Sequence, residues 1–457
     1  MAAVETRGTR PNAALLARVA ARRQQLLGRL ATGAILVPAA RSRLRSADSE
    51  YAFRQDSDFY YLTGFEEPDA LCLLLPEHPQ WHYVLFVRPK NPDEEIWSGR
   101  RAGVEEAVRT YGADAAFSVQ EIPEKLPELL RDIDTLHYAW GRDSGLEREL
   151  ERIFAEHRRT RPRRGRGIVA LQDPATVLHE MRLVKDDYEL GCMRAAAAAS
   201  AAGHLRVLQE TRSGMHEYEL EAMLEYEFRV RGARGPAYGT IVGGGANATI
   251  LHYRQNDARL EDGQLVLVDA GAEVELYAAD ITRTFPAGAA FTAAQRDTYA
   301  VVLEAQKRAI ECVRPGAAFH EPHERALDGL CQGLVDLGLL PGPAARVRES
   351  GDFRRFYMHR TSHWLGLDVH DVGLYEVQGA ARRFEAGMVL TVEPGLYVAP
   401  DLDAVQAAFR GIGVRIEDDI LVTAVGCEVL TAAVPKEIDA IEALRRVPAS
   451  IGARAPR

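Results

Sequence analysis

Two histidines and four acidic residues stand out in this sequence because of the apolar stretches that surround them. The segment SHWLGLDVHDVG, Ser362–Gly373, carries His363 and His370. The acidic residues follow or lie within short apolar runs: Asp269 in LVLVDAG, Asp280 in DITRTFP, Glu393 in TVEPGLY and Glu417 in GVRIEDD. Carboxylates held close together repel one another unless a positive charge lies between them. The pattern therefore indicates a metal site, a set of catalytic groups, or polar residues of the fold with no role in chemistry.

The first two acids belong to a predicted hairpin. Residues 264–268 form an apolar run that predicts a strand ending at Asp269, and a second strand carries Asp280. If the turn is centred between Val274 and Glu275, the two aspartates face each other with Cβ atoms roughly 5 Å apart. A β-bulge would shift this register. Direct opposition of the two aspartates is therefore a hypothesis.

The two glutamates lie on further predicted strands. Glu393 directly precedes a proline, which restricts it to extended geometry. In GVRIEDDILV, alternation puts Arg415, Glu417 and Asp419 on one face of a strand. With His363, the set comprises two Asp, two Glu and one His, which suits Mn, Co or Fe better than structural zinc. A pair of such metals, bridged by carboxylates, generates hydroxide at neutral pH, so the chemistry indicated is metal-assisted hydrolysis.

The elements that position these residues fall into two domains. A chain of 457 residues is too long for one small core. We expect an α/β N-terminal domain, 1–173, with strands at 33–39, 70–76 and 82–87 and helices at 12–30 and 123–133. We expect a catalytic domain, 174–457, with helices at 174–231, about 292–313 and 321–338, and strands from Gly235 onward.

Charge and cysteine content argue against several classes of function. The net charge of −10 argues against nucleic acid as a partner, because nucleic-acid binding depends on Lys and Arg. We interpret the basic run HRRTRPRRGRG, 157–167, as a solvated linker rather than an RNA patch. No run of about 18 apolar residues occurs, so no membrane span is predicted. The five scattered cysteines form no C-x-x-C pair, which is typical of a cytoplasmic protein.

Five ordered motifs carry a resemblance to a known family. LVLVDAG, DITRTFP, SHWLGLDVHDVG, TVEPGLY and GIGVRIEDD closely resemble the motifs of the pita-bread metallopeptidases, in particular their proline-specific aminopeptidases. The segments 51–70, YAFRQDSDFYYLTGFEEPDA, and 95–103, EIWSGRRAG, are similar to the N-terminal domain that accompanies these members. The resemblance implies an α+β catalytic domain of the pita-bread (creatinase/methionine aminopeptidase-like) fold, with a curved antiparallel sheet.

The resemblance also implies roles for individual residues. It implies two divalent metal ions per subunit, usually manganese, held by Asp269, Asp280, His363, Glu393 and Glu417. In the family, the second Asp and the last Glu bridge the metals, and the bridging water or hydroxide is the nucleophile. Glu393 would be the general base, and His252 and His370 would stabilise the developing oxyanion. Substrate-binding roles are implied for His359, Arg415, Tyr238 and Trp97, the last from a neighbouring subunit of a homo-oligomer, dimer or tetramer.

The predicted reaction is release of the N-terminal residue from peptides whose second residue is proline. One alternative is a prolidase, which cleaves only Xaa-Pro dipeptides with the same ligands. Another is a non-catalytic peptide- or protein-binding member of the fold, although such members typically lose ligands. Gly239 stands where the family usually has asparagine, so the resemblance does not determine the shape of the pocket beside Tyr238. We interpret Asp368 and Asp371, which flank His370, as structural.

Overall fold

The computed structural model describes residues 12–30 and 32–446. These residues form two compact units, an N-terminal one that ends at Arg182 and a C-terminal one from Leu183 to Arg446. The sequence analysis placed the domain boundary slightly earlier, at 173/174. Helix α7 (Ala175–Leu183) lies between the two placements.

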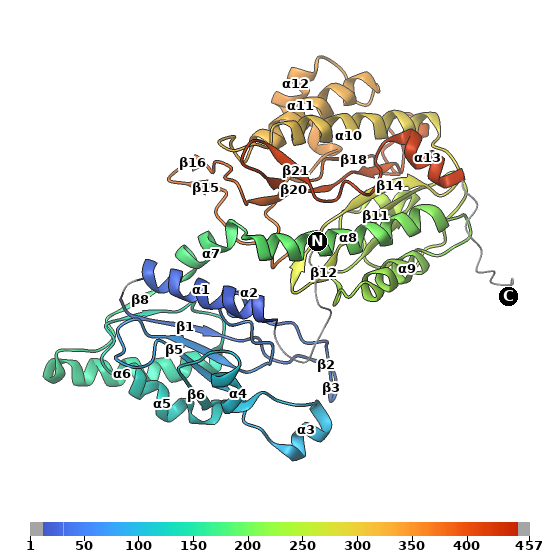
Figure 1. Cartoon of the computed structure of the whole chain (residues 1–457). Helices are drawn as coiled ribbons and strands as arrows, with labels where there is room; N and C mark the ends of the chain where they lie inside the picture. Colours follow the sequence, from blue (N-terminus) through green and yellow to red (C-terminus); the bar gives the residue numbers. More distant parts are fainter. Residues whose placement is uncertain (1–11, 31, 447–457) are drawn as a thin grey trace. The chain divides into compact units, whose positions relative to one another are not determined.

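A mixed six-stranded sheet forms the centre of the N-terminal unit, in the order β6-β5-β4-β1-β7-β8 (Figure 1). Strands β1, β4 and β5 pair antiparallel, whereas β6, β7 and β8 join in parallel. The bounds are β1 (Ala34–Pro38), β4 (Leu71–Leu74), β5 (Tyr83–Val87), β6 (Ala115–Ser118), β7 (Thr135–His137) and β8 (Ala170–Gln172), with a separate hairpin of β2 (Leu44–Ser46) and β3 (Ser49–Glu50). This architecture confirms the α/β class expected for the first domain.

Helices cover both faces of this sheet. One face packs against α5 (Ile122–Leu129) and α6 (Ser144–Arg164) in a single apolar core. The other face carries α1 (Ala13–Arg29) and α2 (Ser57–Thr63) (Figure 1). The expected helix at 12–30 is confirmed, because the Asn12 side chain accepts a hydrogen bond from the Ala14 N–H at 2.8 Å and caps α1. The remaining helices are α3 (Pro92–Ser98), α4 (Gly103–Arg109) and the 3₁₀ turn η1 (Val119–Glu121).

The basic run at 157–167 is mostly helical, so its interpretation as a linker is wrong. Helix α6 continues through the run to Arg164 and ends where Gly165 adopts a left-handed conformation, φ 74°. Three arginines fall in the last turn, where positive charge interacts favourably with the helix dipole. His157 points inward and is buried, so this part of the run belongs to the fold.

A buried ion-pair cluster connects α2 with α7 inside the N-terminal unit. The Asp58 carboxylate accepts hydrogen bonds from Arg182 Nη1 at 2.7 Å and Arg142 Nη2 at 3.3 Å. It also lies 3.2 Å from His179 Nε2. Burial alone would raise the pKa of Asp58, but His179 and Arg182 lower that pKa below its usual value. The cluster therefore stabilises the unit with an ionised aspartate.

We expect Asp58→Asn to lower the free energy of unfolding of the N-terminal unit by about 3 kcal/mol, because it removes the charge of Asp58 from its buried ion pair with Arg182. This contribution is present above about pH 4, the ordinary pKa of aspartate, and is lost as the pH falls further. Hydrogen exchange of β1 and β4 in urea measures the change. Asp132→Asn, which breaks an exposed pair with Arg164, is the control and should cost less than about 1 kcal/mol. Equal costs would contradict the assignment.

The C-terminal unit combines antiparallel sheets with helices (Figure 1). Its sheets have the orders β10-β11-β14, β13-β12-β9, β17-β20-β21 and β18-β19, beside the hairpin β15-β16. The strands are β9 (Gly235–Pro236), β10 (Ile241–Gly244), β11 (Leu265–Asp269), β12 (Ala272–Val274), β13 (Tyr277–Ala278), β14 (Thr282–Pro286), β15 (Glu376–Val377), β16 (Ala380–Ala381), β17 (Val389–Val392), β18 (Gly395–Tyr397), β19 (Gly413–Arg415), β20 (Asp418–Val422) and β21 (Cys427–Val429). This arrangement confirms the expected α+β class.

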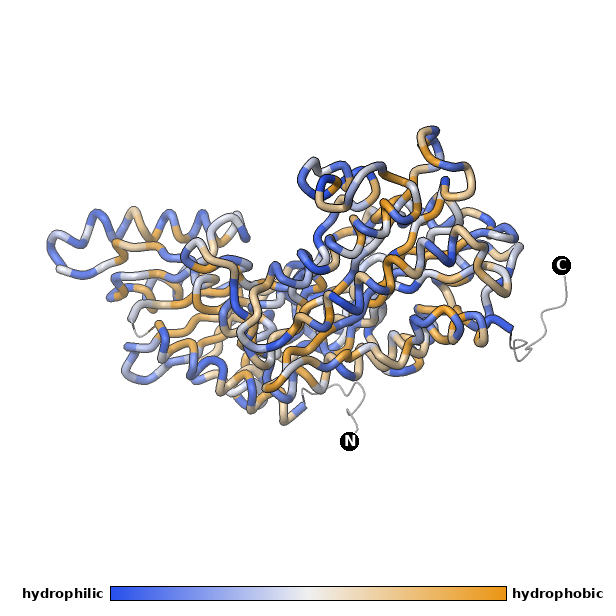
Figure 2. Tube along the Cα trace, turned by 90° about the horizontal axis from the view of Figure 1, so that it is seen from above, coloured by the Kyte–Doolittle hydropathy of each residue, from blue (hydrophilic) through white to orange (hydrophobic). Residues whose placement is uncertain are grey.

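Four helices of this unit lie within the expected segments: α8 (Asp187–Glu210), α9 (Glu217–Val230), α10 (Ala293–Glu311) and α11 (Glu321–Asp336). Two further helices, α12 (Ala344–Ser350) and α13 (Ile438–Arg446), were not predicted, nor were the 3₁₀ turns η2 (Gly245–Thr249), η3 (Asp352–Arg355) and η4 (Ala407–Phe409). Hydrophobic stretches alternate with hydrophilic ones along the chain trace (Figure 2). One core cluster joins the strands of this unit to α8, α9, α10 and α11. Within residues 12–30 and 32–446, no helix combines the length and apolar character needed to cross a membrane.

Candidate active site

Five side chains from distant parts of the C-terminal unit line one cavity of about 300 Å³. They are Asp269 at the end of β11, Asp280 after β13, His363 in the long loop after η3, Glu393 after β17 and Glu417 before β20. His363 is brought to Glu393 by pairing, because the Thr391 N–H donates to the His363 carbonyl oxygen at 3.0 Å. The fold thus brings together all five residues singled out as metal ligands.

The hairpin that carries the two aspartates has a different register from the one predicted. Its turn is centred between Glu275 and Leu276, which both have positive φ, 50° and 65°. Asp269 therefore pairs with Thr282, and the predicted direct opposition of Asp269 and Asp280 is wrong. Alternate residues of a strand share a face, so Asp280 still points to the same side as Thr282 and Asp269.

His363 presents an unprotonated ring nitrogen to the carboxylates. Its Nδ1 donates to the Trp364 carbonyl oxygen at 3.0 Å, which leaves the lone pair on Nε2. Nε2 lies 3.6 Å from Asp280 Oδ2 and 3.6 Å from Glu393 Oε1. Burial lowers the pKa of His363 to about 4, so the ring is neutral at neutral pH. Ligand atoms of Asp280, His363 and Glu417 all lie within 4.8 Å of one another, as a shared cation requires.

The carboxylates of this cavity carry more negative charge than nearby side chains balance. Burial raises the pKa values of Asp280, Glu393 and Glu417, and neighbouring carboxylates raise them further. Arg415 supplies one positive charge, with Nη2 2.5 Å from Asp269 Oδ2. An anionic site of four carboxylates and one neutral imidazole fits divalent cations that prefer oxygen ligands. The residues present therefore fit a metal centre.

Tyr238 contacts the carboxylates rather than only the open cavity. Its hydroxyl lies 2.6 Å from Asp269 Oδ1 and also contacts Asp280 Oδ1. The sequence analysis expected a substrate-binding role for Tyr238. Its side chain does line the cavity, and its hydroxyl holds the two aspartates at the floor.

Three residues to which the sequence analysis gave no role hold the carboxylates in position. The Thr282 hydroxyl donates to Glu417 Oε2 at 2.7 Å. Arg283 Nη1 donates to the Glu417 carbonyl oxygen at 2.5 Å. The Asp280 N–H donates to both oxygens of Asp419, at 3.2 and 3.1 Å. Alternation along DITRTFP puts Thr282 on the side of Asp280, and this signal could have identified it.

His252 and His370, expected to contact the substrate carbonyl, both line the cavity. The His370 ring lies edge-on to the His363 ring, with centroids 4.4 Å apart. Its neighbour Asp371 accepts a hydrogen bond from Lys185 Nζ at 3.0 Å, and both side chains are about 1% exposed. This buried pair holds the chain beside His370, which agrees with a structural role for Asp371.

His359 and Arg415 also line the cavity, and Tyr397 connects them. The Tyr397 hydroxyl lies 2.8 Å from His359 Nε2, and Arg415 Nη1 donates to it at 3.2 Å. Burial lowers the pKa of His359 to about 4. Tyr397 was not predicted, although alternation from Glu393 puts it on the same face of the strand. Trp97, in contrast, lies on α3 of the N-terminal unit and is 90% exposed.

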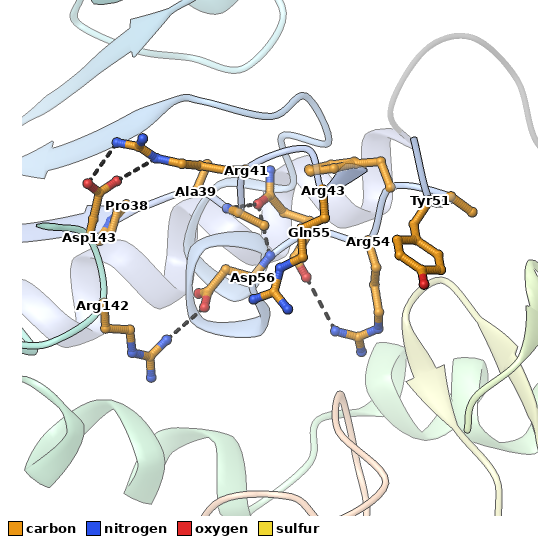
Figure 3. Close-up of a pocket in the computed structure, with 13 residues that line it drawn as sticks. Pro38, Ala39, Arg41, Arg43, Tyr51, Arg54, Gln55, Asp56, Arg142 and Asp143 are labelled. Carbon is orange, nitrogen blue, oxygen red and sulfur yellow. Dashed lines mark hydrogen bonds and ion pairs between the residues drawn. The ribbon is translucent and has the colours of Figure 1, made fainter. Parts of the chain in front are cut away.

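The N-terminal unit has a cavity of its own, about 710 Å³ (Figure 3). Arg41 makes two hydrogen bonds to Asp143, Nε–Oδ2 at 2.9 Å and Nη2–Oδ1 at 2.7 Å. Arg142 makes one to Asp56 at 2.7 Å. These ion pairs tie the segment after β1 to the start of α6. Because they occupy the carboxylates of this cavity, we assign the chemistry to the C-terminal cavity.

Comparison with known proteins agrees with this assignment. Residues 191–424 match metallopeptidase family M24, and residues 19–137 match the aminopeptidase P N-terminal domain. The Xaa-Pro aminopeptidase of Haemophilus influenzae is 45% identical over 405 residues, covering 88% of this chain and 90% of the relative. That of Escherichia coli is 44% identical over 425 residues, covering 93% and 96%. The solved structure of Pseudomonas aeruginosa aminopeptidase PepP superposes with a TM-score of 0.92 at 46% identity, covering 94% and 98%.

The chain belongs to metallopeptidase family M24, with the aminopeptidase P N-terminal domain preceding a pita-bread catalytic domain. Family membership implies divalent metal ions. Its activity is that of an Xaa-Pro aminopeptidase, a hydrolase specific for proline as the second residue. The fold and function implied by the sequence motifs are both confirmed.

Proposed function

We propose that this chain removes the N-terminal residue from Xaa-Pro peptides with two divalent metal ions, assigned as Mn²⁺ from the family resemblance, held by Asp269, Asp280, His363, Glu393 and Glu417. Convergence of these five side chains on one cavity carries the proposal. Asp280, His363 and Glu417 would hold metal together, which the clustering of their ligand atoms within 4.8 Å of one another supports. Bound metals would polarise the scissile carbonyl and supply a nucleophile at neutral pH.

The remaining residues bind the peptide and move protons. Glu393 takes the proton of the attacking water and passes it to the leaving proline nitrogen. The position of Glu393 at the floor, 3.6 Å from His363 Nε2, supports this role. His252 and His370 donate hydrogen bonds to the carbonyl oxygen as negative charge develops on it. His359, Arg415 and Tyr238 orient the substrate, and their lining of the cavity supports these roles.

A comparison of peptide lengths tests the reaction. We expect Ala-Pro-Gly to be cleaved to alanine and Pro-Gly, with kcat/KM at least about tenfold above that of Ala-Pro, because the pocket continues past proline in an aminopeptidase. Product analysis by chromatography measures both rates in a series of Mn²⁺, Co²⁺, Fe²⁺ and Zn²⁺. Activity confined to the dipeptide would establish a prolidase instead. No hydrolysis of either peptide with any metal would establish a non-catalytic member of the fold.

We also propose that the chain forms a homo-oligomer, dimer or tetramer, in which Trp97 completes the pocket of a neighbouring subunit. The exposure of Trp97 and of the adjacent Ile96, 90% and 79%, supports a protein contact at α3. A cytoplasmic location is proposed as well. It is supported by the five cysteines, all of which are free thiols.

A further inference from the structure

Two arginines line the active-site cavity without a part in holding the metal ligands. Arg254 and Arg360 are both exposed, whereas the carboxylates of the floor are buried or half-buried, so the arginines lie on the solvent side of the cavity. Among the described residues, neither guanidinium has a hydrogen-bond or ion-pair partner. Arginines that support a fold are usually paired with acids, as Arg415 is with Asp269. These two present unpaired positive charge to whatever enters the cavity.

The backbone that carries Arg254 is held firmly. Tyr253, between His252 and Arg254, is buried, and its hydroxyl donates to Glu217 Oε2 at 2.9 Å. The same fully buried carboxylate accepts the Ala258 N–H at 2.9 Å. These hydrogen bonds hold the segment on its buried side. The side chains before and after Tyr253, His252 and Arg254, both line the cavity. Arg254 is therefore fixed in register with His252, which is proposed to touch the scissile carbonyl.

Gly239 makes room for the Arg254 side chain. A Cβ at Gly239 would lie 3.2 Å from Arg254 Cδ and 3.3 Å from its Nε, closer than side-chain atoms ordinarily approach. The guanidinium thus rests on the glycine next to Tyr238. A Cβ at this position would therefore require the Arg254 side chain to shift by a few tenths of an ångström.

The open side of the cavity orients a peptide within it. In the proposed reaction the scissile carbonyl lies at the floor beside the metal ligands, and only the part of the peptide beyond proline varies in length. That part must extend to the solvent side of the cavity, where Arg254 and Arg360 lie. Each residue of extended chain spans about 3.3–3.6 Å, so the carbonyl carbon of the third residue lies roughly 7 Å beyond the scissile carbonyl carbon, on the solvent side.

We propose that Arg254 and Arg360 bind a carboxylate on the third residue of the peptide, either an acidic side chain or the C-terminal carboxylate of a tripeptide. Guanidinium groups bind carboxylates through charge-assisted hydrogen bonds. The inference rests on the proposed Xaa-Pro aminopeptidase mechanism and defines which peptides it prefers. Peptides with a negative charge at this position would be cleaved faster than neutral ones.

Four tripeptides that share Ala-Pro test the proposal. One pair is Ala-Pro-Glu-amide and Ala-Pro-Gln-amide, which isolates the side chain; the other is Ala-Pro-Gly and its amide, which isolates the C-terminal carboxylate. We expect the charged member of at least one pair to have a kcat/KM roughly three- to tenfold above its neutral partner. This ratio should fall as NaCl is raised, because salt screens exposed charges.

Variants assign the preference to the two arginines. The double variant Arg254→Gln/Arg360→Gln should bring the ratio close to one, whereas Arg212→Gln, an exposed arginine outside the cavity, should leave it unchanged. Gly239→Asn should lower the ratio without removing a charge. Each ratio compares two substrates of the same preparation, so partial misfolding cancels.

The outcomes separate this inference from the function on which it rests. A wild-type chain that cleaves none of the four peptides contradicts the proposed function. One that cleaves all four without preferring the charged peptides contradicts the carboxylate subsite alone. A preference that persists in the double variant also overturns the assignment to Arg254 and Arg360. If only one pair responds, that pair identifies the source of the carboxylate.

Discussion

Glu393→Gln is expected to lower kcat for Ala-Pro-Gly by about 10³-fold or more, because it removes both the proposed base and one carboxylate of the metal centre. The fold should survive. Glutamine has nearly the same shape, and the burial and neighbouring Glu417 that raise the pKa of Glu393 make a neutral side chain well tolerated there. Single-turnover kinetics, together with thermal unfolding, measure the two expectations separately.

Glu385→Gln is the matched control for this substitution. It makes the same change of charge at an exposed residue of the same unit that does not line the cavity. We expect its kcat to stay within about twofold of wild type, as for most exposed substitutions. A fully active Glu393→Gln variant would remove Glu393 from the mechanism, whereas loss of folding would show that Glu393 stabilises the unit.

Removal of metal is expected to abolish hydrolysis and to destabilise the C-terminal unit at neutral pH. A chelator should lower kcat/KM below detection, and added Mn²⁺ should restore it. An ion that binds only the folded chain stabilises it by about 2.7 kcal/mol when its free concentration is 100 times Kd. Calorimetry of metal-free and Mn²⁺-loaded protein measures this as a higher Tm for the C-terminal unit. Unchanged activity after chelation, checked by elemental analysis, would contradict a metallopeptidase.

The pH dependence of this metal effect has a defined sign. Burial and mutual repulsion raise the pKa values of Asp280, Glu393 and Glu417 in the metal-free folded chain. The metal-free folded chain therefore binds more protons than the unfolded one. As the pH rises from about 4, the ordinary pKa of these carboxyl groups, toward their raised pKa values, the metal-free folded chain becomes less stable. Metal binding requires the ionised carboxylates. The difference in Tm between loaded and metal-free protein should thus grow from pH 5 to pH 8, and a difference that shrinks would contradict the ligand set.

Local signals were sufficient for most helices. The cap at Asn12 and the apolar periodicity of 12–30 predicted α1, because helix capping depends on adjacent residues. The prediction of a linker at 157–167 was wrong because it used charge alone. The inward position of His157 in α6 follows from packing against residues distant in sequence. The predicted position of the turn in the aspartate hairpin was also wrong. Neither Glu275 nor Leu276 is a usual turn residue, so no local signal marked the turn.

The sequence by itself determined the family, the reaction and the residue types of the proposed metal centre, because these depend on ordered motifs whose chemistry can be identified one residue at a time. Only the tertiary structure decided how those residues meet. The contacts of Tyr238 with both aspartates, the link from His359 through Tyr397 to Arg415, and the space at Gly239 that Arg254 fills all join residues from separate strands and loops. Such contacts depend on the register and packing of elements distant in the chain, which no local pattern encodes.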